Sequence, residues 1–346
     1  MERGLVTVSV VTYNSERYIA QCLESVFRQD YPRLEVIVVD NASADKTRSI
    51  LREFEGRARV IYNRQNVGFT AGQNQAIRES KGEWVLVLNP DVRLMPDWVS
   101  MIVAIADPGI GSVCGKLRRM SRDCEIPETP VIDSTGLYFT PALRHFDRGS
   151  GELDDGRYDK FEYVFGASGA AALYRREMIE DVSVRGEFFD SDFFAYREDA
   201  DVAWRAQLLG WKCLYNPLAV AYHVRTVLPT NRRSVDPVLN MHSVKNRWLM
   251  RIKNMTPHLY WRTWVRATLR DAVVTGGCLF GEFRSLRGFW MVGRNFWRFL
   301  KKRRQIMGRR RASDEYIARW FSNQPVSDPA PAIEAAVFER EKIASR

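Results

Sequence analysis

Polar residues follow three apolar runs early in the chain, and their side chains are of kinds that bind small ligands. Thr12–Asn14, Asp40–Asn41 and Asn89–Asp91 each come directly after such a run. A single aspartate in this setting is more often a turn former or helix cap than a ligand. Three such groups together indicate a ligand site, provided that the runs are strands that end at one edge of a sheet.

A second acidic group lies in the middle of the chain. Glu198, Asp199 and Asp201 open a helical stretch, and His223 follows after two short apolar runs, 211–215 and 219–222. An ionised carboxylate can act as a general base, and carboxylate and imidazole groups are ligands of divalent metals. If these residues have only a structural role, they are helix caps and one core histidine.

The elements that would position these groups alternate along the first third of the chain. Apolar, β-branched runs predict buried strands, and amphipathic spacing predicts the helices between them. The predicted strands are 6–11, 34–39, 59–62 and 84–88, and the helices include 16–28 and 68–79. This order predicts an α/β fold with a mainly parallel sheet and helices on both faces. Ligands of such sheets bind at the carboxyl ends of the strands.

Composition excludes several other classes of protein. With 45% hydrophobic and 12% aromatic residues, the 346-residue chain is not mainly disordered. Five cysteines without a C-x-x-C pair argue against a disulfide scaffold or a cysteine zinc site, and they favour a reducing compartment. No apolar run reaches the ~18–20 residues that span a bilayer. We therefore expect a cytosolic chain without a signal peptide.

The positive charge is concentrated in one segment. Residues 241–311 contain 18 Lys and Arg but 2 Asp and Glu, a net charge of +16, whereas the other residues sum to −6. The segment also holds five of the ten tryptophans. Its helices could be a solvated face packed on the rest of the protein. The runs Lys301–Arg304 and Arg309–Arg311, beside aromatic residues, favour helices that lie on an anionic membrane surface. No nucleic-acid-binding motif is present.

Five segments together resemble the motifs of the inverting glycosyltransferases of family 2, and of their bacterial rhamnosyltransferase-like branch. They read VSVVTYN, VVDNAS, NRQNVGFTAGQNQAI, VLNPDV and FFAYREDADVAWRAQLLGWKCLYNP followed by AYH. The resemblance implies a GT-A catalytic domain over 1–230, with a nucleotide-binding half at about 1–92 and an acceptor half at about 93–230. A basic, Trp-rich, membrane-associating helical region would follow over 231–311, and then a loosely held C-terminal tail over 312–346.

The resemblance also implies site residues. Those for the nucleotide are Thr12, Tyr13, Asn14, Asp40, Asn66, Gly68 and Asn74. The family's D-x-D metal motif reads Asn89-Pro-Asp91 here, so Asp91 would be the firm ligand of Mg²⁺ or Mn²⁺, with Asn89 and His223 beside it. Asp40 would read the pyrimidine ring, and Gly68 would permit a close backbone approach to the donor.

The same resemblance makes Asp199 the catalytic base and Glu198 its helper, with Asp201 as the rival for the base role. The expected reaction moves a sugar, L-rhamnose from dTDP-rhamnose, to a lipid-linked or polysaccharide acceptor, with the protein on the inner face of the cell membrane. The alternatives are transfer from another UDP-sugar, and a catalytically dead glycan-binding membrane scaffold. Nucleic acid is not an expected partner, and the oligomeric state is open.

Overall fold

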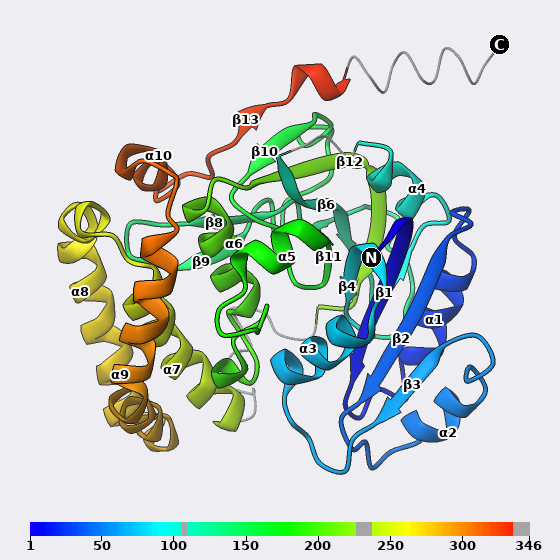
Figure 1. The fold of residues 1–346 in the computed structure, drawn as a ribbon, viewed down its shortest axis with the longest axis horizontal. Coiled ribbons are helices and arrows are strands. Elements are labelled where there is room, and N and C mark those ends of the chain that lie inside the picture. Colours follow the sequence, from blue (N-terminus) through cyan, green and yellow to red (C-terminus); the bar gives the residue numbers. More distant parts are fainter. Residues whose placement is uncertain (106–108, 226–236, 335–346) are drawn as a thin grey trace.

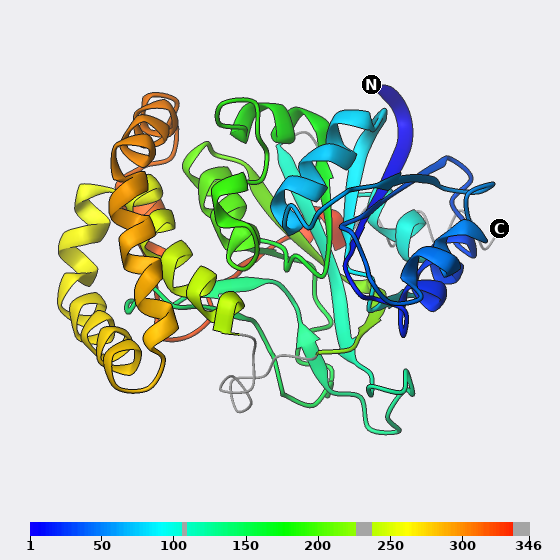
Figure 2. The same cartoon turned by 90° about the horizontal axis from the view of Figure 1, so that it is seen from below.

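The computed structural model describes residues 1–105, 109–225 and 237–334. A large central sheet carries helices on both of its faces, and the helices of the basic segment form a separate layer at the end of the molecule away from β1–β3 (Figures 1 and 2). The sheet runs in the order β13-β10-β12-β6-β11-β4-β1-β2-β3. The expected α/β class and the helical C-terminal region are confirmed.

The first half of the sheet is parallel throughout. Its strands are β1 (Glu2–Thr12), β2 (Leu34–Asp40), β3 (Arg59–Tyr62) and β4 (Gly82–Leu88). The helices between them are α1 (Ile19–Phe27), α2 (Thr47–Arg52) and α3 (Phe69–Glu79). In the register of β1 and β2, Thr12 lies opposite Asp40. Two of the polar groups at the strand ends are therefore neighbours, as the sequence predicts.

Burial on both faces explains the unbroken apolar runs of these strands. Val8 and Val10 of β1 pack in one core with Ile19 and Leu23 of α1. Val11 belongs to a separate core on the opposite face, beside α3. Neighbouring residues of a strand point to opposite faces, so a strand covered on both sides has no polar alternation.

The second half of the sheet mixes directions. β11 (Ala171–Arg175) runs antiparallel between β4 and β6 (Ile110–Arg119), whereas β12 (Lys212–His223) is parallel to β6. The sequence predicts two strands in place of β12. The structure has one, with a register shift between Asn216 and Val220. The remaining strands are β5 (Val92–Leu94), β7 (Ile132–Ser134), β8 (Leu137–Phe139), β9 (His145–Asp147), β10 (Glu162–Val164) and β13 (Asp328–Pro329).

Four short helical elements of the described chain belong to the second half of the sheet. They are α4 (Trp98–Val103), α5 (Arg176–Val182), the short 3-10 turn η1 (Ser191–Phe193) and α6 (Glu198–Leu208). The C-terminal layer consists of α7 (Pro237–Asn254), α8 (Pro257–Phe280), η3 (Phe283–Ser285), α9 (Leu286–Gly308) and α10 (Asp314–Arg319). Within the described ranges, no helix combines the length and the apolar character needed to cross a bilayer.

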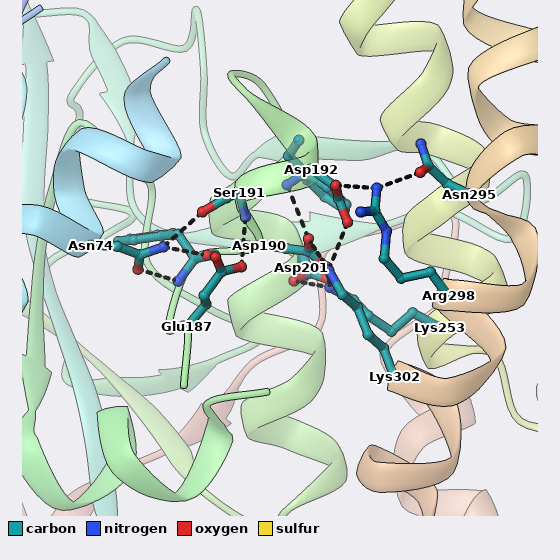
Figure 3. Close-up of polar contacts among 12 residues, drawn as sticks. Asn74, Glu187, Asp190, Ser191, Asp192, Asp201, Lys253, Asn295, Arg298 and Lys302 are labelled. Atoms are coloured by element: carbon teal, nitrogen blue, oxygen red, sulfur yellow. Dashed lines mark hydrogen bonds and ion pairs between the residues drawn. The ribbon is translucent and has the colours of Figure 1, made fainter. Parts of the chain in front are cut away.

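A cluster of buried charged residues joins the helical layer to η1 and α6. Lys253 Nζ of α7 lies 2.6 Å from Asp190 Oδ2 and 2.9 Å from Asp201 Oδ2, and Lys302 Nζ of α9 lies 2.5 Å from Asp190 Oδ1. Figure 3 shows both lysines reaching the acids from the helical layer. All four residues are at most 5% exposed. Lys302 therefore does not face a membrane, which corrects that part of the interpretation of the run at 301–304.

The expected loosely held tail is wrong for residues 312–334. Trp320 and Phe321, just after α10, are buried, and Phe321 packs on Phe139 and Trp204. β13 extends the main sheet by pairing with β10. The predicted domain boundary at 230 and the last part of the predicted tail, 335–346, lie outside the described residues.

Replacing Lys302 by Met is expected to destabilise the protein by about 1–3 kcal/mol, because Asp190 loses one of its two buried lysine partners and keeps only Lys253. Lys301→Met is the matched control: Lys301 is the exposed neighbour on the same helix, and its replacement is expected to change stability by no more than about 0.5 kcal/mol. Urea unfolding curves measure both. Equal losses in the two variants would contradict the structural role of the cluster.

Candidate active site

The ends of β1 and β2 are tied together by a fully buried carboxylate. Asp40 Oδ1 accepts a hydrogen bond from Thr12 Oγ1 at 3.2 Å, and Asp40 Oδ2 accepts from Arg48 Nε at 2.7 Å and from the backbone N–H of Ser43. Both Asp40 and Thr12 have no exposed surface. These two predicted nucleotide-binding residues therefore shape the loop, and both oxygens of Asp40 have partners within the protein.

The loop after β1 carries an exposed aromatic side chain at the edge of the sheet where β1 and β2 end. Tyr13 is 52% exposed. Asn14 has a positive φ of 50° and bridges to the loop after β2, since its backbone N–H donates to Ser43 Oγ and its Oδ1 accepts from the backbone N–H of Ala44. The loop is thus fixed while Tyr13 stays accessible to a planar ligand.

The predicted donor turn at Asn66–Gly68 contacts a segment that sequence reasoning does not place there. The N–H of Gly68 donates to Asn66 Oδ1 at 2.9 Å, and Gly68 has a φ of +88°. A Cβ on Gly68 would lie 2.5 Å from the ring of Phe194. Glycine is required here because Phe194 covers it, which differs from the expected approach of the donor.

Asn74 fastens the same distant segment. Its Nδ2 donates to the carbonyl of Phe189 at 2.7 Å, and its Oδ1 accepts from the N–H of Phe189 at 3.0 Å. Asn74 is 3% exposed and points toward residues 187–192 (Figure 3). Asn74 is thus a predicted nucleotide-binding residue whose side-chain nitrogen and oxygen both already have hydrogen-bond partners within the protein.

The predicted metal ligands Asp91 and His223 come together from different strands. β5 pairs with β12 so that His223 lies opposite Val92, and His223 Nε2 lies 3.4 Å from Asp91 Oδ1. Asn89 reaches the same turn, where its carbonyl accepts from the N–H of Val92. Burial alone would lower the pKa of His223, but Asp91 and Asp133 outweigh burial and raise that pKa to about 10.

Sequence reasoning missed the residues behind His223. Asp133 Oδ2 lies 2.7 Å from His223 Nδ1, and Arg225 joins Asp133 to Asp147. Burial would raise the pKa of Asp133, but His223 and Arg225 hold it below its usual value. Asp133 lies on the three-residue strand β7, and no periodicity in that irregular region marks it.

This arrangement fits a divalent cation in part. Asp91 and His223 offer an oxygen and a nitrogen close enough to share one ion, and Asp133 orients the imidazole as carboxylates behind metal-bound histidines do. Among the described residues, no three His, Cys, Asp or Glu side chains gather to hold a metal. An ion here would need further oxygen ligands, as Mg²⁺ and Mn²⁺ do when they bind phosphates and water.

The expected base lies at the first turn of α6. Asp199 Oδ2 accepts from the N–H of Gly169 at 3.1 Å, and Asp199 Oδ1 accepts from the N–H of Ala200 at 2.7 Å. Burial raises the pKa of Asp199 above its usual value, and the N–H of Gly169 opposes this shift. Burial and the charge of Asp199 raise the pKa of Glu198 to about 8. At neutral pH Glu198 is therefore protonated.

Asp201, the rival for the base role, has a structural environment. It is 1% exposed, and its carboxylate accepts from Arg205, Lys253 and Asn254 at distances between 2.8 and 3.0 Å. All its strong partners belong to the protein interior. Its place is in the buried charge cluster.

A family model described as Glycosyl transferase family 2 matches residues 7–183, just over half of the chain. The chain belongs to this family. Expectation and finding agree on the family, and the rhamnosyltransferase-like branch remains a proposal. Glu198, Asp199 and the whole helical layer lie beyond the matched residues of this family 2 chain.

Sequence relatives cover part of the family 2 chain. EpsH of Bacillus subtilis (strain 168) is 28% identical over 206 residues, which are 57% of this chain and 56% of EpsH. The succinoglycan biosynthesis protein ExoO of Rhizobium meliloti (strain 1021) is 26% identical over 232 residues, 64% of this chain and 61% of ExoO. The chain thus spans little more than half the length of these relatives.

Solved structures support the GT-A fold. S. aureus TarS 1–349 in complex with UDP-GlcNAc superposes with a TM-score of 0.54 at 19% identity, over 86% of this chain and 81% of that one. The mannosyltransferase PcManGT of Pyrobaculum calidifontis, in complex with GDP-Man and Mn²⁺, gives a TM-score of 0.50 at 19% identity, over 88% and 85%.

The raised pKa of Asp199 has a consequence for the pH dependence of sugar transfer. A base must be ionised, so kcat/KM is expected to fall about tenfold per pH unit below an apparent pKa that lies above 3.8. The wild-type profile should bend again near pH 8, where Glu198 loses its proton, and Glu198→Gln should lack that second bend. A profile that is flat down to pH 4 would contradict the assignment of the base.

Proposed function

We propose that the chain is an inverting glycosyltransferase that moves L-rhamnose from dTDP-rhamnose to a lipid-linked or polysaccharide acceptor. The observation that carries the proposal is the carboxylate of Asp199, held by two backbone N–H groups near the strand-end edge that also bears Asp91 and His223. The choice of rhamnose rests on the likeness of the sequence motifs. A UDP-sugar is the second candidate donor, because TarS, a neighbour in fold, has been solved with UDP-GlcNAc.

In this mechanism Asp199 accepts the proton of the acceptor hydroxyl as its oxygen attacks the anomeric carbon. Attack opposite the leaving diphosphate inverts the configuration at that carbon. A divalent ion at Asp91 and His223 would stabilise the negative charge that develops on the leaving diphosphate. Since the leaving group needs no proton, no second carboxylic acid is required, unlike in glycoside hydrolysis.

The nucleotide would lie along the ends of β1 and β2. Tyr13 is exposed there and can stack on a pyrimidine, and Asn14 and Asp40 fix the loops around it. Asn66 would lie in the turn beneath the donor, whereas Gly68 of the same turn is covered by Phe194. A catalytically dead scaffold is the weaker alternative, since Asp91 and Asp199 are both present and both have ordered partners.

We also propose that the helical layer binds an anionic membrane surface, where a lipid-linked acceptor would lie. The exposed positions of α9 carry basic and aromatic residues, among them Arg287, Trp290, Arg294, Trp297, Lys301 and Arg304. Exposed large apolar side chains continue over α8 and η3, namely Tyr260, Trp261, Trp264, Val265, Leu269, Val273, Leu279, Phe280 and Phe283. Basic and aromatic residues on one face are typical of helices at a membrane interface.

A screen of nucleotide-sugars tests the proposed function. Purified protein is incubated with dTDP- and UDP-sugars in Mn²⁺, Mg²⁺ or EDTA, and release of the nucleoside diphosphate is measured. We expect turnover of one donor that requires the metal. Asp199→Asn should lower that turnover by ~10²–10⁴-fold, because it keeps shape but cannot accept a proton, while donor affinity stays near that of wild type. Full activity of Asp199→Asn would refute the mechanism.

Vesicle co-sedimentation tests the membrane proposal. Replacing Arg294, Lys301 and Arg304 together by Gln should weaken binding to anionic vesicles by up to about 100-fold, since each basic residue contributes up to ~1 kcal/mol. High salt should partly release the wild type.

The matched control removes the same charge from the nucleotide-binding half, by replacing the exposed Arg28, Arg52 and Arg78 with Gln. An equal loss of vesicle binding in the control would mean that net charge alone acts. Wild-type protein that ignores anionic vesicles would refute the proposal.

A further inference from the structure

The turn that leads into α6 has an unfavourable backbone. Phe194, Tyr196 and Arg197 have φ values of 68°, 69° and 71°. Side chains other than glycine rarely adopt this region, and such residues persist only where the surroundings hold them. Since Glu198 is the first residue of α6, the shape of this turn decides where Glu198 and Asp199 lie.

One side chain of α7 binds the turn along its length. Asn246 Nδ2 donates to the carbonyl oxygens of Phe193, Ala195 and Tyr196 at 3.0, 2.9 and 2.8 Å. Asn246 has no exposed surface, and its Oδ1 has no hydrogen-bond partner among the residues that the structure describes. Three carbonyl acceptors fix the orientation of the amide, so Asn246 serves this place as a donor alone.

Neighbours of Asn246 on α7 hold the rest of the segment. Lys245 Nζ donates to the carbonyl of Asp192, and Arg197 Nε donates to the carbonyl of Ser243 at 2.9 Å. The ring of His242 stacks on Phe194, with centroids 4.7 Å apart. The same few residues of one helix thus contact residues 192–197 throughout.

The other side of the turn contacts Gly68 and Thr70, at the predicted donor turn and the start of α3. Phe194 covers Gly68, and the carbonyl of Phe194 accepts from the N–H of Thr70 at 3.2 Å. The turn is therefore held between α7 and the start of α3. Movement of α7 away from the turn would leave the carbonyls of Phe193, Ala195 and Tyr196, which lie among the positive-φ residues, without the amide donor that binds them.

We propose that Asn246 is a positioning residue for sugar transfer: through the strained turn at 193–197 it sets the place of Asp199. The inference rests on the proposed role of Asp199 as the base. Asn246 touches no substrate in this role. It also lies outside residues 7–183 that match the family, so the helical layer would complete the active site rather than only support it.

The experiment compares Asn246→Ala with Asn254→Ala. Asn254 is an equally buried asparagine of α7 whose Nδ2 donates to Asp201 Oδ1 at 2.8 Å and which, within the described part of the chain, has no hydrogen bond to the turn. Asp201 keeps Lys253 and Arg205 as partners when this donor is removed. Both variants remove a buried amide donor, so we expect similar losses in thermal stability. Asn246→Ala alone should lower kcat, by ~10–100-fold, because small misplacements of a catalytic group have effects of this size. Its KM for the donor should stay within about twofold of wild type.

Hydrogen exchange of the backbone amides gives a readout that needs no activity. Peptides that cover residues 193–201 should exchange faster in Asn246→Ala than in wild type or Asn254→Ala. Asn246→Ser keeps a single donor, so its kcat and its exchange rate should fall between those of wild type and Asn246→Ala. It replaces the alanine variant should that fail to fold. Equal kcat losses in the two alanine variants, or unchanged exchange in Asn246→Ala, would overturn the proposal. Absence of transfer by the wild type would instead refute the proposed function.

Discussion

The buried pairing of Asp190 and Asp201 with Lys253 and Lys302 is the interaction on which the arrangement of the candidate active site depends. It joins the segment before η1, the first turn of α6 and two helices of the C-terminal layer. Charges inside a protein lose their hydration, so the cluster is favourable only when every member is in place. A shifted docking of α7 would leave buried charges unpaired. The cluster therefore fixes the height and rotation at which α7 meets the turn before Glu198.

The hydrophobic pattern of the sequence predicted those elements whose form depends on local burial. The strands β1–β4 and the edge at which Thr12 and Asp40 meet follow from apolar runs that are buried on both faces. The residues that support the site from later segments, such as Asp133 and Asn246, could not be found in this way. Their partners lie tens of residues away in the chain, and a single polar residue in an irregular strand or a long helix carries no periodic signal.

The charge segregation has two physical causes that composition alone does not separate. Part of the positive charge of the C-terminal segment is matched within the protein, since Lys302 contacts Asp190 and Arg311 contacts Asp181. Another part, including Lys301 and Arg304, is exposed. Adjacent residues of one helix face opposite environments, so a basic run is informative only after the helix has been placed. Hydropathy is limited in the same way, because Trp320 and Phe321 are buried although they lie in a polar, proline-containing stretch.

The order in which the ribosome makes these parts sets the order in which the protein can become active. The four parallel strands are complete by Leu88, and Glu198 and Asp199 emerge well before Asn246 and Lys302. A nascent chain can thus fold its sheet early, as N-terminal units commonly do, while the proposed base, Asp199, still lacks the helices that contact its segment. Under the proposed mechanism, catalysis would begin only once α7 and α9 had been synthesised and docked. An unfinished chain would in this way be kept from hydrolysing a sugar donor without transfer.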